Sequence, residues 1–70
     1  MLRTQVQSSN LRSIGYDAET QTLEIEFTSG GVYQYYGVSS ATFQGLMNAA
    51  SHGTYFHQHI KNNYSYHRIN

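Results

Sequence analysis

The clearest pattern in the chain is a strict alternation of apolar and polar side chains around Leu23, Ile25 and Phe27, with Glu24 and Glu26 between them. Side chains two apart on an extended segment share a face, so the three apolar residues face one way and the two glutamates the other. This alternation predicts a half-buried antiparallel strand in which Phe27 is a core aromatic. Similar patterns predict strands at residues 11–16 and 32–38, and weaker ones are compatible with short extended segments at residues 6–10 and 64–69.

A Ser-Gly-Gly segment at residues 29–31 separates two of these strands and predicts a hairpin. A three-residue loop with Gly at the left-handed position places Phe27 opposite Tyr33 and Ile25 opposite Tyr35. A two-residue loop would instead bring the polar amide of residue 34 onto the apolar face. We therefore expect Tyr33 and Tyr35 to face the core, and their neighbours at positions 34 and 36 to face outward.

The pattern then changes to a helical period. Phe43, Leu46 and Met47 are three and four residues apart and lie on one face of a helix. The serines at positions 39–40 precede this face and are suited to cap its first turn. Gly53 is placed to end the helix in a left-handed conformation.

A second, shorter helix is predicted from Thr54 to about Asn62, because Phe56 and Ile60 lie four residues apart. The order of elements indicates the α+β class. We expect a single domain over residues 1–70, in which a small antiparallel sheet of about three strands is followed by two helices packed on one face.

Composition narrows the functional classes. The chain of 70 residues has four Lys/Arg, four Asp/Glu and no Cys. This excludes a polybasic arm, an acidic tail, a disulfide framework and a thiolate site. No apolar run has the roughly 20 residues needed to cross a bilayer, and no secretory signal is visible, so we expect a cytoplasmic protein without a membrane partner.

An ordered series of short blocks carries a family resemblance. Ile-Gly-Tyr-Asp at residues 14–17 is followed by Tyr-Gln-Tyr at 33–35, by Leu-Met-Asn-Ala-Ala-Ser-His-Gly at 46–53 and by Ile-Lys-Asn-Asn-Tyr at 60–64. Together they resemble the KTSC domain family, over roughly residues 5–68. The family is named from its occurrence at the C-terminus of some lysyl-tRNA synthetases, and it also occurs as free-standing bacterial and phage proteins. Its central Tyr-x-Tyr corresponds to Tyr33 and Tyr35.

The resemblance implies no established activity, although RNA binding has been suggested for the family from its synthetase context. The chain departs from the family pattern at Ser39, Thr54 and His57, where Pro, a basic residue and Asn are usual. The missing basic residue at Thr54 weakens the suggestion of RNA binding for this member.

Exposed aromatic rings can stack on bases, and cations contact phosphates. The residues that we expect at a nucleic-acid or ligand site on these grounds are Tyr36, Tyr55, His57, Lys61, Tyr64 and Arg68. The residues of the family motif that we expect to be structural are Ser9, Tyr33, Tyr35, Ser51, Gly53 and Phe56.

The sequence offers no constellation for catalysis or metal binding. His57 and His59 would point about 200° apart on a helix, so they cannot share a metal ion. No serine has a base and an orienting acid within a recognisable motif. We therefore expect a non-catalytic binding module, with no cofactor, whose partner is RNA. Two alternatives stay open: a protein–protein or self-association module, and an oligomer that binds a nucleotide-sized ligand.

Overall fold

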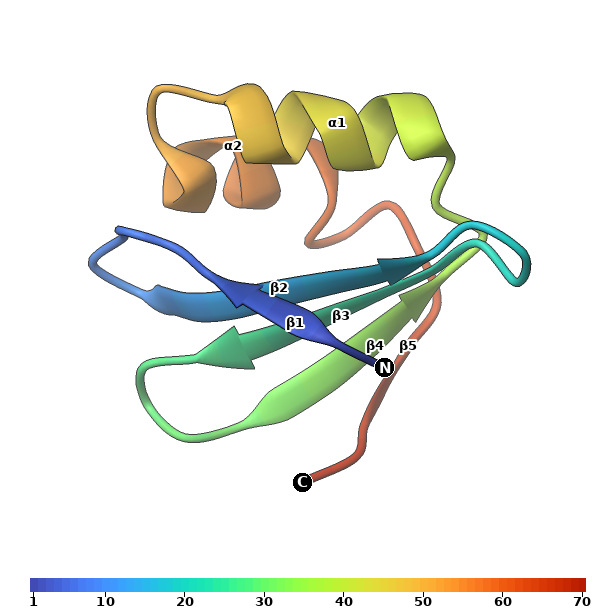
Figure 1. Ribbon diagram of the computed structural model, residues 1–70, viewed down its shortest axis with the longest axis horizontal. Helices are drawn as coiled ribbons and strands as arrows, with labels where there is room; N and C mark the ends of the chain where they lie inside the picture. Colours follow the sequence, from blue (N-terminus) through green and yellow to red (C-terminus); the bar gives the residue numbers. More distant parts are fainter.

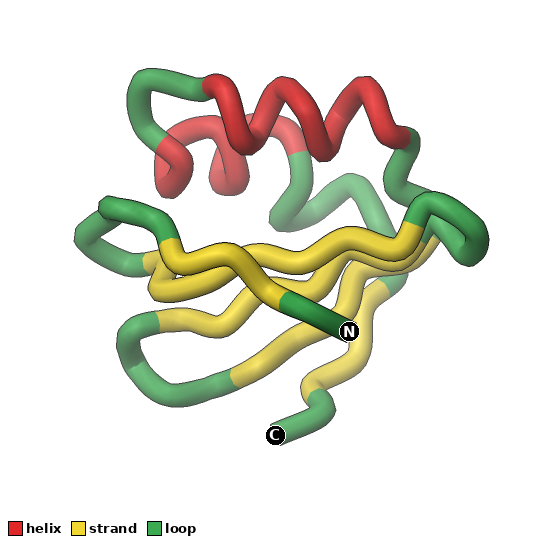
Figure 2. The backbone as a smooth tube through the Cα atoms, viewed as in Figure 1, coloured by secondary structure: helices red, strands yellow, loops and turns green.

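A computed structural model describes residues 1–70 of the protein. It shows one sheet layer that is covered on one face by two helices (Figures 1 and 2). The sheet has five strands, every one antiparallel to its neighbours, in the order β1-β2-β3-β4-β5. The expected α+β architecture is confirmed, but the sheet is larger than the three strands predicted. The elements in chain order are β1 (Arg3–Gln5), β2 (Leu11–Asp17), β3 (Thr22–Phe27), β4 (Val32–Tyr36), α1 (Ser40–Asn48), α2 (His52–His59) and β5 (Tyr66–Arg68).

The core lies between the helices and the sheet face that the alternation predicted. Leu23 and Ile25 of β3 are fully buried there, together with Ile14 of β2. Leu46 of α1 and Phe56 of α2 close the core from above. The remaining members of the same buried cluster are Leu11, Tyr35, Val38 and Ile60.

The β3–β4 hairpin differs from the predicted register by two residues. Leu23 pairs with Tyr35 and Ile25 pairs with Tyr33, so the three-residue loop is Thr28–Gly30 rather than residues 29–31. Gly30 has φ +112° and supplies the left-handed position that such a loop requires. A shift of two leaves side-chain facing unchanged, and Tyr33 and Tyr35 lie on the core side as expected.

Both helices begin with a serine cap. The Ser39 side chain accepts a hydrogen bond from the Thr42 backbone N–H, and Ser51 accepts one from Thr54. The prediction that Gly53 ends the first helix is wrong: α1 ends at Asn48, and Gly53 lies in the first turn of α2. Gly53 is instead a point of close approach, since a Cβ there would collide with the Asn10 side chain.

The two edge strands are short and exposed. The N-terminal edge is β1 at Arg3–Gln5, and not residues 6–10, where the sequence was compatible with a short extended segment. The C-terminal edge, β5, falls inside the predicted segment and pairs with β4. No helix is long and apolar enough to cross a membrane.

Candidate functional site

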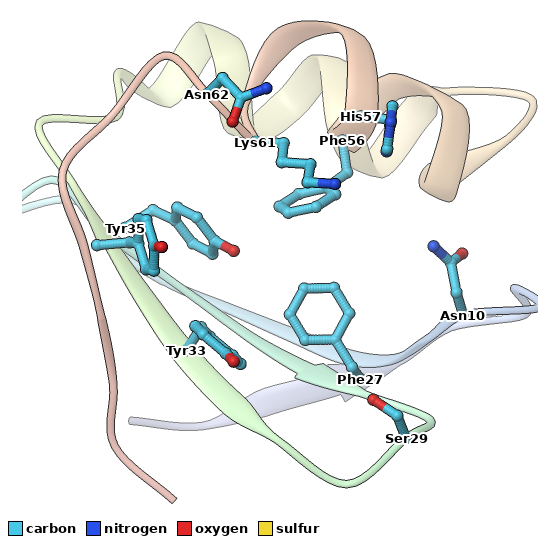
Figure 3. A pocket seen from close by; sticks show the side chains of 10 residues that line it. Asn10, Phe27, Ser29, Tyr33, Tyr35, Phe56, His57, Lys61 and Asn62 are labelled. Atoms are coloured by element: carbon cyan, nitrogen blue, oxygen red, sulfur yellow. The ribbon is translucent and has the colours of Figure 1, made fainter.

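A groove of about 450 Å³ lies between the sheet and α2, at the end of the molecule where the β3–β4 hairpin turns (Figure 3). The sheet supplies its floor and the side chains on and after α2 supply the opposite wall. Its lining residues are Asn10, Phe27, Ser29, Tyr33, Tyr35, Phe56, His57, Lys61, Asn62 and Tyr66.

The floor of the groove is aromatic and continuous with the core. Phe27 meets Tyr33 edge-on, with ring centroids 5.5 Å apart, and meets Phe56 edge-on at 5.4 Å. Tyr35 also meets Phe56 edge-on at 5.4 Å, and its ring centroid lies 5.7 Å from that of Tyr66. Each ring therefore restricts the orientation of its neighbours, and the aromatic floor is preformed.

The Tyr35 hydroxyl is the one deep polar group of this floor. The residue is only 4% exposed, yet its hydroxyl has no hydrogen-bond partner within the chain. No side-chain oxygen or nitrogen is both fully buried and unpaired, so this hydroxyl opens onto the groove. Burial, reinforced by Tyr33 and Tyr66 nearby, raises the pKa of Tyr35 to about 12. The hydroxyl is thus protonated, and available to donate, across the physiological pH range.

The charge around the groove is positive. Lys61 and His57 belong to the wall (Figure 3). Arg68, beside the groove, places its guanidinium carbon 5.8 Å from the centroid of the Tyr33 ring. None of the lining residues is acidic. An anion that approaches this end of the molecule therefore meets two permanent cations and no carboxylate in the lining.

The buried carboxylate of the protein lies on the opposite sheet face. Glu24 forms an ion pair with Arg3 of β1 and accepts a 2.9 Å hydrogen bond from the Gln34 side chain. Its burial alone would raise the pKa of Glu24. The hydrogen bonds from Gln34 and Arg3, with the charge of Arg3, outweigh that and hold the pKa below its usual value. Glu24 was expected on the outer face, and it lies there, but Arg3 covers it so that it is 4% exposed.

Comparison with known proteins places this geometry in a family. The model of the KTSC domain matches residues 7–64, most of the chain. The chain belongs to the KTSC domain family. The resemblance carried by the sequence blocks is thereby confirmed.

Relatives of this KTSC domain occur both alone and inside larger proteins. An uncharacterized protein of Stutzerimonas stutzeri is 49% identical over 70 residues, which is 99% of each chain. The crystal structure of a KTSC domain protein from Yersinia pestis superposes with a TM-score of 0.96 at 40% identity, covering 99% of this chain and 97% of that one. A lysine–tRNA ligase of Trichormus variabilis is 40% identical over 63 residues, and the chain spans only 11% of that protein.

The structure of this KTSC domain separates the expected binding residues into two groups. His57 and Lys61 line the groove, and Arg68 stands beside it. The other three lie outside it. Tyr36 is on the opposite sheet face, where its hydroxyl donates to Gln34; Tyr55 and Tyr64 are partly buried against the core.

The position of Tyr55 is explained by its packing against α1. Its ring lies against Gly45 of α1, and a Cβ at Gly45 would collide with the Tyr55 hydroxyl. The His59 ring also contacts the Tyr55 ring, in a tilted arrangement with the ring centroids 4.5 Å apart. This close contact brings α1 and α2 together and leaves Tyr55 little surface for a ligand.

The residues expected to be structural lie in two places. Tyr35 and Phe56 are core residues, Tyr33 is partly buried against the core, and all three line the groove. The other three line a second, polar recess of about 490 Å³ that shares Asn10 and His57 with the groove. These three are Ser9, Ser51 and Gly53.

Four lining residues were missed by reasoning from the sequence, and Tyr66 of β5 was not among the expected site residues either. Its weak alternation with Arg68 was the available signal, because side chains two apart on a strand share a face. Nothing in the local sequence marks the polar lining residues, which come from three separate loops. They are Asn10, Ser29 and Asn62, and the fourth, Phe27, was expected in the core. No cluster of three potential metal ligands forms anywhere in the chain.

Proposed function

We propose that this KTSC domain is a non-catalytic, cytoplasmic module that binds single-stranded RNA in the aromatic groove. One observation carries the proposal: a groove floored by aromatic rings has Lys61 and Arg68 beside it and no acidic residue in its lining. Single-strand binders combine such stacking surfaces with cations that follow the phosphate backbone. Duplexes hide their bases, so the floor favours unpaired nucleotides.

The affinity follows from the small number of charges. Two permanent cations neutralise about two phosphates, and the chain as a whole has no net charge. We therefore expect weak binding that falls as salt rises, with a slope of about −1.4 for log K against log salt, at about −0.7 per contact for single strands.

The relatives give independent support. The matched segment makes up 11% of the Trichormus variabilis protein named as a lysine–tRNA ligase, whose name refers to an RNA substrate. A module that adds RNA contacts would suit such an enzyme. The relative that matches over 99% of its own length indicates that the domain also occurs without a ligase.

The test is fluorescence anisotropy of a labelled single-stranded RNA hexamer, titrated with protein at several salt concentrations. We expect Lys61→Gln and Arg68→Gln each to weaken binding and to reduce the slope by about 0.7. Arg12→Gln is the matched control, because Arg12 is exposed and does not line the groove. Binding that is absent at low salt, or equal in all four proteins, would refute the proposal.

Self-association is the second candidate, favoured by the exposed edge at β1. Leu2 is 95% exposed beside a strand whose outer edge has no partner. Native mass spectrometry distinguishes the two: a dimer that Leu2→Ser disrupts would favour self-association, whereas a monomer with bound RNA would favour the first proposal. A fixed small adduct on each chain would instead indicate a ligand-binding protein.

A further inference from the structure

The Tyr35 hydroxyl differs from the other well-packed tyrosine hydroxyl of this sheet. Tyr16 donates a hydrogen bond to the Val38 carbonyl, at 2.5 Å, and so completes a contact within the chain. Tyr35 is 4% exposed and donates to nothing in the chain, although a buried polar group normally has a partner. Since its oxygen opens onto the groove, its acceptor is whatever occupies the groove, which is water in the free protein and an acceptor atom of a ligand when one is bound.

The surroundings of the hydroxyl indicate the chemistry of that acceptor. Phe27, Tyr33 and Phe56 line the groove with aromatic rings, which favour an aromatic group as the ligand. The permanent charge comes from the exposed Lys61 and from Arg68 beside the groove, not from its floor. A ligand that fits this arrangement of aromatic floor and peripheral cations has an aromatic ring with an acceptor on its edge. It carries its negative charge at a distance from that ring.

We infer that the groove takes one unpaired nucleobase, whose carbonyl or ring-nitrogen edge accepts a hydrogen bond from the Tyr35 hydroxyl while Lys61 holds an adjoining phosphate. The volume of about 450 Å³ is small for a ligand site and suits a single nucleotide. This inference rests on the proposed function and adds to it that the domain reads a base edge, beyond the stacking and charge that any single strand would satisfy.

The test compares two variants that each delete one tyrosine hydroxyl. Tyr35→Phe keeps the ring and removes the donor. Tyr16→Phe is the matched control, because its hydroxyl bonds within the chain and lies outside the groove. The probes are four single-stranded RNA homohexamers, one for each base, and a hexamer of abasic ribose phosphates, with binding followed by anisotropy at fixed low salt.

For Tyr35→Phe we expect about three- to tenfold weaker binding of the best-bound homohexamer. Its affinity for the abasic hexamer, its salt slope and its thermal midpoint should equal those of the wild type. For Tyr16→Phe we expect a lower thermal midpoint and unchanged binding of every probe. This opposite pair of outcomes would assign the Tyr35 hydroxyl to the ligand rather than to the fold.

Two results separate failure of the inference from failure of the proposed function. If the wild type binds homohexamers with the expected salt slope but Tyr35→Phe binds them equally well, the base-edge contact is wrong and RNA binding stands. The same conclusion follows if Tyr35→Phe weakens the abasic hexamer by the same factor. If the wild type binds none of the probes, the proposed function fails and the inference falls with it.

Discussion

Phe56 joins the helices, the sheet and the groove, so its truncation tests the packing most directly. The residue is 4% exposed, and its ring contacts those of Phe27 and Tyr35 at centroid distances of 5.4 Å each. Phe56→Ala removes a buried ring from a well-packed site, which costs about 3–5 kcal/mol. At about 0.05–0.15 kcal/mol per residue, a domain of 70 residues has about 3.5–10 kcal/mol of total stability. We therefore expect the variant to lose at least about 30% of its free energy of unfolding.

The assay is urea unfolding followed by circular dichroism, comparing midpoints at equal m values. Phe56→Leu keeps most of the volume and should cost less than about 1.5 kcal/mol. Phe27→Ala should cost about 2–3 kcal/mol, less than a fully buried phenylalanine, because Phe27 is half-buried at the groove. Two results would refute the assignment of Phe56 to the centre of the core. One is a loss below about 1 kcal/mol for Phe56→Ala, and the other is a loss for Phe27→Ala that exceeds the loss for Phe56→Ala.

Two further predictions concern acid stability and the hairpin. The pKa of Glu24 in the folded protein lies below the 4.5 of a free glutamate, so Glu24 contributes stability above pH 4.5 that is lost as pH falls through the folded-state pKa. As the pH is lowered beneath 4.5, the thermal midpoint of the wild type should therefore decrease, and that of Glu24→Gln should decrease less steeply. If the two plots of thermal midpoint against pH are parallel, another carboxylate is responsible. Gly30→Ala places a Cβ at φ +112° and should cost about 1–2 kcal/mol in urea unfolding, whereas Ser29→Ala should cost almost nothing. Equal stability of Gly30→Ala and the wild type would contradict the left-handed loop.

The alternation in β3 was sufficient to predict which face of the sheet is buried, because the side-chain period of a strand is fixed at two. It was not sufficient for the register. Gly30 and Gly31 both suit the left-handed position of a three-residue loop, and only the backbone reveals that Gly30 occupies it. The facing of Tyr33 and Tyr35 was nevertheless predicted correctly, since the two alternatives differ by an even number of residues.

Two other features depend on contacts that local sequence does not record. The strand β1 has no apolar alternation, and its place in the sheet is supported by the ion pair between Arg3 and Glu24, 21 residues apart. Glycine is a residue type that commonly ends helices, but Gly53 does not end one, because Ser51 caps a new helix two residues before it. The reason for glycine there is the approach of Asn10 from a distant loop.

The candidate site was predicted in part for the same reason. Lys61 and His57 lie on or just after a helix whose apolar face was visible in the sequence, so their outward position could be inferred. The interpretation of the sequence assigned each tyrosine either to the core or to a binding surface, and not to both. Tyr35 is both, because the groove penetrates to the core at this point.

This shared floor limits how the domain can acquire new specificities. Any substitution at Tyr35 or Phe56 that alters the shape of the groove also removes contacts on which folding depends. The rim is under no such restriction, because Ser29, Lys61 and Asn62 are exposed and absent from the core. Divergence among KTSC domains, or a library built to change what this one recognises, should therefore succeed at the rim while the aromatic floor stays fixed.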